Sequence, residues 1–115
     1  MTANTNKLNG AMMNLNQYFL IKIAEESSEV AQIALKAAHF GLSEIQPGRT
    51  ETNAERVYGE LNDLLAMVHQ LGEVSNGEFW FDIGSPDQVA IAKKLAKVQH
   101  YLACSQSLGL VEATQ

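Results

Sequence analysis

Residues 21–40 read IKIAEESSEVAQIALKAAHF, and this stretch decides the fold. Apolar side chains recur in it at steps of three and four residues, which is the spacing that lines one side of an α-helix. We expect a helix over residues 13–40, because Gly41 stands where a glycine commonly closes a helix. The apolar stripe of this helix consists of Phe19, Ile23, Val30, Ile33, Ala34 and Ala37.

A second helix follows after a turn at Pro47-Gly48. Thr52-Asn53-Ala54-Glu55 has the form of a capping box, so this helix is expected to begin at residue 53 and to end at 72–74. The members of its apolar stripe share the helical spacing of the first segment. They are Val57, Leu61, Leu64, Val68 and Leu71.

A third helix is expected over residues 86–107, which makes the predicted fold all-α. Ser85 would be its N-cap and Pro86 would occupy the first helical position, where a missing N–H costs nothing. Residues 78–84, EFWFDIG, precede this helix, and we expect them to form an ordered aromatic loop, although a single strand there stays open.

The composition indicates a folded, acidic chain. With 115 residues, 46% of them hydrophobic and 18% charged, the chain is too apolar for disorder and long enough for one domain over residues 1–115. Eight Lys plus Arg against thirteen Asp plus Glu give a net charge of −5, which argues against a nucleic-acid polymer as partner. The single cysteine, Cys104, excludes an internal disulfide, and we expect it to be a small buried side chain.

The sequence also lacks the marks of a membrane protein. Its apolar runs are far shorter than the roughly 20 residues of a membrane-spanning helix. The polar start MTANTNKLNG does not have the basic-then-apolar order of a signal peptide. We therefore expect no membrane partner and a cytoplasmic location.

Acidic residues interrupt the apolar side of both long helices. At about 100° per residue, Glu26 lies inside the apolar arc of the first helix and Glu29 lies at its edge. Glu60 and Asp63 take the same places on the second helix, 34 residues further along the chain. Buried, unpaired carboxylates cost several kcal/mol each and repel one another, so a cation is expected close by.

Basic side chains alone leave this acidic group short of neutral. Lys22 and Arg56 could form i, i+4 pairs with Glu26 and Glu60, which gives two cations for four acids. A divalent metal with oxygen ligands would supply the missing charge, and this donor type favours Mg²⁺, with Mn²⁺ as a substitute. The alternative interpretation is a solvated acidic face with intrahelical ion pairs.

Two motifs in these helices match a known pattern. Glu25-Glu26-Ser27-Ser28-Glu29 and Glu60-Leu61-Asn62-Asp63 resemble the EExxE and ExxD motifs of the MazG-like, all-α nucleoside triphosphate pyrophosphohydrolases. The resemblance covers about residues 14–74. The 30 residues between the motifs, 30–59, are slightly more than the family pattern, and we place the excess in the connection 41–51.

This resemblance implies Mg²⁺-dependent hydrolysis of a (deoxy)nucleoside triphosphate, for example a purine nucleotide such as dGTP, to the monophosphate and pyrophosphate. Glu26, Glu29, Glu60 and Asp63 would bind the metal, and Glu25 or Glu26 would orient or deprotonate the attacking water. The substrate-binding candidates are Lys22, Lys36, Arg56, Lys93, Gln17 and Tyr18, and Arg49 is among the further basic candidates.

Two other functions stay open. One is a phosphoribosyl-ATP pyrophosphohydrolase-like enzyme, which would share the architecture and differ in substrate. The other is a non-enzymatic helical protein that binds a partner through its apolar faces, which would have no reason to gather four acids.

The length of the first helix predicts self-association. At about 1.5 Å per residue it would span roughly 42 Å, so part of its apolar stripe would stay uncovered in a monomer. The family resemblance also implies dimers or tetramers in which neighbouring chains help to enclose the nucleotide. We therefore expect a bundle of three main helices that is completed by homo-oligomerisation.

Overall fold

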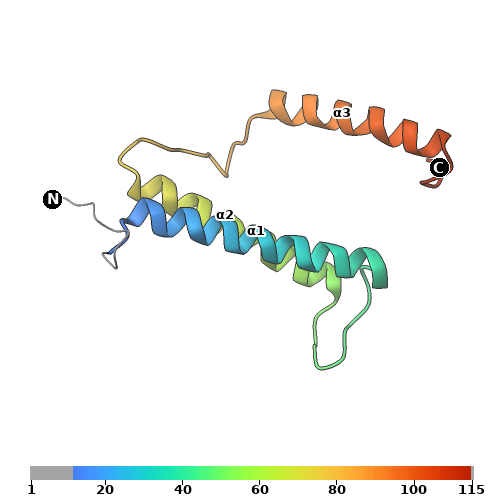
Figure 1. Ribbon diagram of the computed structural model, residues 1–115, viewed down its shortest axis with the longest axis horizontal. Coiled ribbons are helices and arrows are strands. Elements are labelled where there is room, and N and C mark those ends of the chain that lie inside the picture. The colour runs from blue at the N-terminus through green and yellow to red at the C-terminus, as the bar shows by residue number, and fades with distance from the viewer. Residues whose placement is uncertain (1–11, 115) are drawn as a thin grey trace. The chain divides into compact units, whose positions relative to one another are not determined.

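The computed structural model describes residues 12–114, and every regular element in that range is an α-helix (Figure 1). The helices are α1 (Leu15–Phe40), α2 (Asn53–Val74) and α3 (Gln88–Ser107). The prediction of an all-α fold is confirmed. The chain divides into two compact units between Ile83 and Gly84, and each unit is described by itself.

The first unit is built on a hairpin in which α1 and α2 pack antiparallel (Figure 1). The two helices have 26 and 22 residues, which correspond to lengths of about 39 Å and 33 Å. Among the described residues, the buried apolar side chains are Ile33 and Ala37 of α1 and Leu71 of α2. The contact between the helices is therefore narrow.

The buried side of each helix is rotated away from the predicted centre. Ala34 and Leu61 were expected in the apolar stripes, but both are exposed. On the helical wheel, the buried side of α1 is centred roughly 50° from Ile23, in the direction of Glu26. The buried side of α2 turns toward Glu60 by a similar angle. The two acids therefore lie nearer the helix contact than the apolar pattern predicted.

Side-chain caps set the first residues of both hairpin helices. The Oδ1 atom of Asn14 accepts from the backbone N–H of Gln17 at 2.8 Å, and Gln17 Oε1 accepts from Asn14 N–H at 2.8 Å. This capping box starts α1 at Leu15, two residues after the predicted start. The predicted box at α2 is confirmed, since Thr52 Oγ1 accepts from Glu55 N–H at 3.1 Å.

The loop between α1 and α2 is tied to the start of α2 by Asn53, which is fully buried. Its Nδ2 atom donates to the carbonyl oxygen of Gly41 at 2.9 Å and to Glu44 Oε1 at 3.0 Å. Gly48 has φ +82°, a left-handed conformation that glycine adopts without steric cost, and it forms the predicted turn. The loop is therefore folded back on the helix that follows it.

The aromatic segment after α2 forms neither a helix nor a strand, in agreement with the predicted ordered loop. Ser75 is almost fully buried, and its Oγ accepts from the backbone N–H of Phe79 at 3.2 Å. The Trp80 ring lies against Gly72, where an added Cβ would approach Trp80 Cε3 to 2.6 Å. The segment is thus packed on the last turns of α2.

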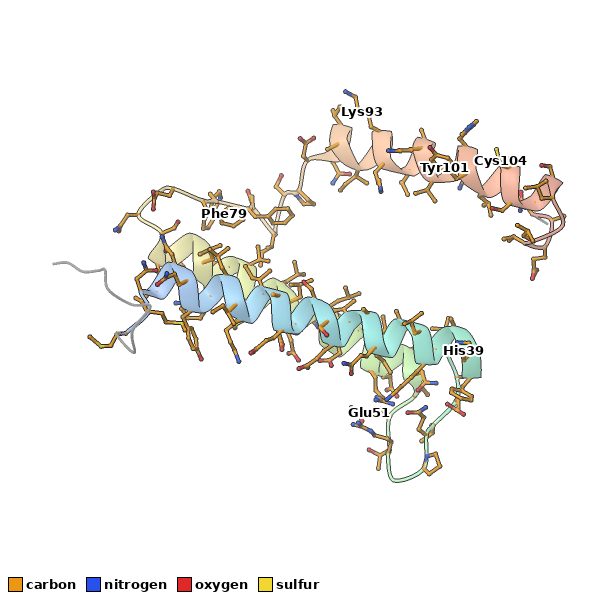
Figure 2. All side chains as sticks on the ribbon, viewed as in Figure 1. His39, Glu51, Phe79, Lys93, Tyr101 and Cys104 are labelled. Atoms are coloured by element: carbon orange, nitrogen blue, oxygen red, sulfur yellow. The ribbon has the colours of Figure 1, made fainter. Side chains whose placement is uncertain are left out.

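The second unit contains α3, which begins at Gln88 with Asp87 as its N-cap. Asp87 Oδ1 accepts from the backbone N–H of Ala90 at 3.0 Å. The predicted start with Ser85 as the N-cap is therefore wrong. The prediction of a buried Cys104 is also wrong, because this residue of α3 is exposed (Figure 2). None of the helices in the described range combines the length and the apolar character needed to cross a membrane.

Candidate functional site

The four predicted metal ligands come from both helices of the hairpin. Glu26 of α1 and Glu60 of α2 are half-buried, whereas Glu29 and Asp63 are exposed. This is the order that the helical wheel predicts, with one acid inside each arc and one at its edge.

The pKa of Glu26 is affected by burial and by the charged residues around it. Burial raises the pKa of this carboxyl above its ordinary value, and the charges of Glu29 and Asp63 raise it further. The nearby Lys22 ammonium acts in the opposite direction with a smaller effect. Because Asp63 belongs to α2, Glu26 senses an acidic group across the helix contact.

The pKa of Glu60, on the other helix of the hairpin, is raised in the same way. Burial is again the largest cause of its raised pKa, followed by a hydrogen bond with Asp63 and by the charge of Glu29. The charge of Glu26 adds a smaller increase. The four acids thus form one interacting group, which we call the carboxylate group: Glu26, Glu29, Glu60 and Asp63.

The donor chemistry of the carboxylate group fits a hard divalent cation. All its donors are carboxylate oxygens, the ligand type that Mg²⁺ prefers. The Oε2 atom of Glu26 is buried and has no hydrogen-bond partner among the described residues, so a cation would satisfy it. In residues 12–114, however, no three His, Cys, Asp or Glu side chains are gathered into a cluster that could hold a metal.

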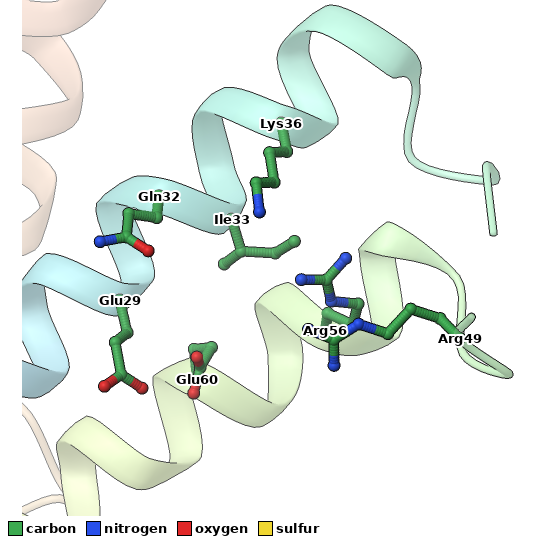
Figure 3. Close-up of a pocket in the computed structure, with 7 residues that line it drawn as sticks. All are labelled: Glu29, Gln32, Ile33, Lys36, Arg49, Arg56 and Glu60. Carbon is green, nitrogen blue, oxygen red and sulfur yellow. The ribbon is translucent and has the colours of Figure 1, made fainter. Parts of the chain in front are cut away.

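A polar pocket of about 310 Å³ adjoins the carboxylate group (Figure 3). Glu29 and Glu60 lie on one side of it, and three cationic side chains enter from the other. Lys36 comes from α1, Arg56 from α2 and Arg49 from the loop between them. The remaining lining residues are Gln32 and Ile33.

Arg56 does not make the predicted pair with Glu60. Its Nη1 atom donates to Gln46 Oε1 at 2.8 Å, and Gln46 belongs to the same loop as Arg49. The guanidinium group is therefore held by a neutral acceptor and keeps its charge available to the pocket.

Lys22 and Glu25 also differ from the simple pairing that the sequence suggests. The Nζ atom of Lys22 donates to Glu25 Oε1 at 3.0 Å, so the ion pair is i, i+3 and does not involve Glu26. This hydrogen bond and the Glu25 charge raise the pKa of Lys22. The same ammonium lies 5.9 Å from the centre of the Tyr18 ring. Glu25 is thus paired with Lys22, next to the carboxylate group in the sequence.

Two further predicted substrate-binding residues are Gln17 and Lys93. The side chain of Gln17 completes the cap of α1. Lys93 is on α3, in the second unit (Figure 2).

The sequence did not single out two residues beside the carboxylate group, Gln32 and Gln46, and it offered Arg49 only as one of several further basic candidates. Gln32 follows Glu29 by three residues and therefore shares its helix face. Arg49 follows the Pro47-Gly48 turn directly, which is a signal that the chain reverses there. No local pattern reveals Gln46, because its importance comes from the path of the loop.

No protein-family model, curated protein or solved structure matches the chain.

Proposed function

We propose that the chain is a Mg²⁺-dependent nucleoside triphosphate pyrophosphohydrolase that releases a nucleoside monophosphate and pyrophosphate. The observation that carries this proposal is the mutual perturbation of acids on α1 and α2, centred on the half-buried Glu26 and Glu60. We choose this reaction because the two motifs resemble those of the MazG-like enzymes. The pocket beside the acids, with cations on its far side, supports a phosphorylated substrate.

In this proposal the carboxylate group would hold Mg²⁺ or Mn²⁺. Such an ion, when bound, neutralises phosphate charge and lowers the pKa of a water. Glu26 or Glu25 would orient or deprotonate the attacking water. Glu25, which forms an ion pair with Lys22, would assist by orienting the water.

A nucleotide screen tests the reaction. We expect Mg²⁺-dependent release of pyrophosphate from at least one of the eight common nucleoside triphosphates, with the monophosphate as the other product. Glu60→Gln should abolish this activity, whereas Glu73→Gln, at an exposed position of the same helix, should leave it intact. Accumulation of diphosphate and orthophosphate would instead indicate a phosphatase.

Metal binding is tested separately by calorimetric titration of Mn²⁺ into the wild type and the same two variants. We expect Glu60→Gln to bind the ion much more weakly than Glu73→Gln does. Equal binding by all three proteins would refute the carboxylate group as the metal site.

We further propose that the chain works as a homo-oligomer. Exposed apolar side chains line a second face of α2, where Tyr58, Leu61 and Leu65 are 71%, 44% and 38% exposed. On α1, Ile21 and Leu35 are 45% and 63% exposed. Apolar faces of this kind are typical of interfaces between chains, and twofold pairing is the commonest closure.

A further inference from the structure

Three cationic side chains share one pocket although the chain is acidic overall. Lys36, Arg49 and Arg56 are three of the eight Lys and Arg residues, and all three line the pocket beside the carboxylate group (Figure 3). Within the described part of the chain, none of them forms an ion pair. Glu29 and Glu60 line the same pocket, but among the described residues neither is joined to these cations by a direct ion pair.

The loop from Gly41 to Thr52 brings two of these charges into place. Asn53 anchors the loop through its Nδ2 bonds to Gly41 and Glu44. Gly48 then turns the chain, and the backbone N–H of Arg49 donates to the carbonyl oxygen of Gln46 at 3.0 Å. Gln46 in turn accepts from Arg56 at 2.8 Å. One short segment thus carries Arg49 and orients Arg56.

The chemistry of this arrangement selects a multiply charged, oxygen-rich anion. Guanidinium groups donate several N–H bonds in a fixed plane and match the geometry of phosphate oxygens. Two guanidinium groups and an ammonium from three different segments gather on one side of the pocket, which suits several linked phosphates better than one carboxylate. The acids on the other side of the pocket would repel an anion placed against them, so the phosphates would lie toward the cations.

We propose that Lys36, Arg49 and Arg56 form a polyphosphate subsite, which binds the phosphates that leave as pyrophosphate and also binds inorganic polyphosphate without a nucleoside. As the pyrophosphate end of a substrate, this subsite rests on the proposed function; as a binding site for inorganic polyphosphate, it stands independently. Arg49 supplies affinity directly, and Gln46 is a positioning residue that acts through Arg56. The length of the loop between the two motifs would then have a function, namely the delivery of Arg49.

Calorimetric titration of inorganic tripolyphosphate, in the presence of Mg²⁺, tests the subsite. We expect the wild type to bind it and Arg49→Gln to bind it about tenfold more weakly or worse, which is the effect of losing one charge-assisted interaction. Lys97→Gln removes the same charge from an exposed position of α3 and should not change the affinity. Gln46→Leu leaves every charge in place and should weaken binding several-fold, an effect that net charge cannot produce.

Several outcomes would overturn the subsite. These are a wild type that does not bind tripolyphosphate, an equal loss of affinity in Arg49→Gln and Lys97→Gln, and unchanged affinity in Arg49→Gln. Circular dichroism checks that each variant is folded. If Arg49→Gln is not folded, Arg49→Lys replaces it, because it keeps the charge but loses the planar donor group and should still weaken binding.

The subsite and the proposed function can fail separately. If no nucleotide is hydrolysed but tripolyphosphate binding depends on Arg49, the polyphosphate site stands and the enzymatic proposal fails. If a nucleotide is hydrolysed with the same KM by the wild type and Arg49→Gln, the enzymatic proposal stands and the subsite is wrong.

Discussion

Two features of the surroundings of Glu60 disfavour its ionised form. It is half-buried near the helix contact, and it faces three other acids, so the folded chain favours its protonated form. A carboxyl whose pKa is raised on folding stabilises the fold below its unfolded value of about 4.5, and this stability is lost as the pH rises through the folded value. The ionised carboxylate is therefore a cost to the fold in the absence of a cation.

Glu60→Gln should remove this cost. In a buffer with chelator, we expect a Tm a few degrees higher than that of the wild type at pH 7, with the difference shrinking toward zero near pH 4. Thermal unfolding followed by circular dichroism over this pH range measures it. Glu73→Gln is the control and should show little difference at either pH. A Tm difference for Glu60→Gln that does not change with pH would contradict the electrostatic explanation.

Asn53 is the residue on which the loop between the helices depends. Its side chain is fully buried and Nδ2 bonds two oxygens, so Asn53→Ala would leave the carbonyl of Gly41 without this donor. We expect the free energy of unfolding to fall by about 1–3 kcal/mol. Asn62→Ala, at an exposed position of α2, should change it by less than about 0.5 kcal/mol. Urea unfolding of both variants measures the difference, and equal effects would contradict the anchoring role.

At the scale of single residues, the sequence predicted positions on helices better than positions in loops. The spacing of Glu26 and Glu60 on their helices was sufficient to predict two half-buried acids, because a helix has a fixed period. Arg49 and Gln46 could not be selected in this way. Their places depend on a loop whose path is set by Asn53 and by the left-handed Gly48, and such a path is not periodic.

At the scale of the elements, the start of a helix could be predicted where the sequence offers a single possible N-cap residue. Thr52 and Glu55 form the predicted box at the start of α2. Before α3, Ser85 and Asp87 are two possible caps only two residues apart, and Asp87 takes the role. Aspartate and serine are about equally good N-caps, so propensity alone could not decide between them.

The contact between Trp80 and α2 can be tested by comparing alanine substitutions at two glycines of the same helix. Gly59 and Gly72 are both in α2, and alanine favours a helix by up to about 1 kcal/mol over glycine at either place. A Cβ at Gly59 meets nothing within 4 Å, whereas one at Gly72 would approach Trp80 Cε3 to 2.6 Å. We expect Gly59→Ala to be more stable than the wild type and Gly72→Ala to lose part or all of that gain.

The fluorescence of Trp80, the chain's one tryptophan, reports the same contact. Gly72→Ala should shift its emission to longer wavelength, because the ring must move away from the helix toward solvent. Gly59→Ala should leave the spectrum unchanged. If both variants gained the same stability and kept the wild-type spectrum, the packing of the aromatic segment on α2 would be wrong.

On the scale of the whole molecule, the hairpin buries too little to account for its apolar content. Ile33, Ala37 and Leu71 are the buried apolar side chains among the described residues, while large apolar groups on both hairpin helices stay exposed. Burial of apolar surface contributes roughly 25 cal/mol per Å², so covering the second faces of α1 and α2 would add substantially to stability. A second copy of the chain offers the same faces, and a twofold axis would let them pair.

We therefore expect light scattering coupled to size exclusion to give a mass of at least twice 12.6 kDa at micromolar concentration. Leu61→Glu places a charge on the exposed apolar face of α2 and should shift the mass toward 12.6 kDa, because burying that charge in an interface costs several kcal/mol. Ala66→Glu adds the same charge to an exposed position on another side of α2, about 140° from Leu61, and should leave the mass unchanged. A wild type that stays at 12.6 kDa over this concentration range would refute self-association, and equal masses for Leu61→Glu and the wild type would exclude this face of α2 as the interface.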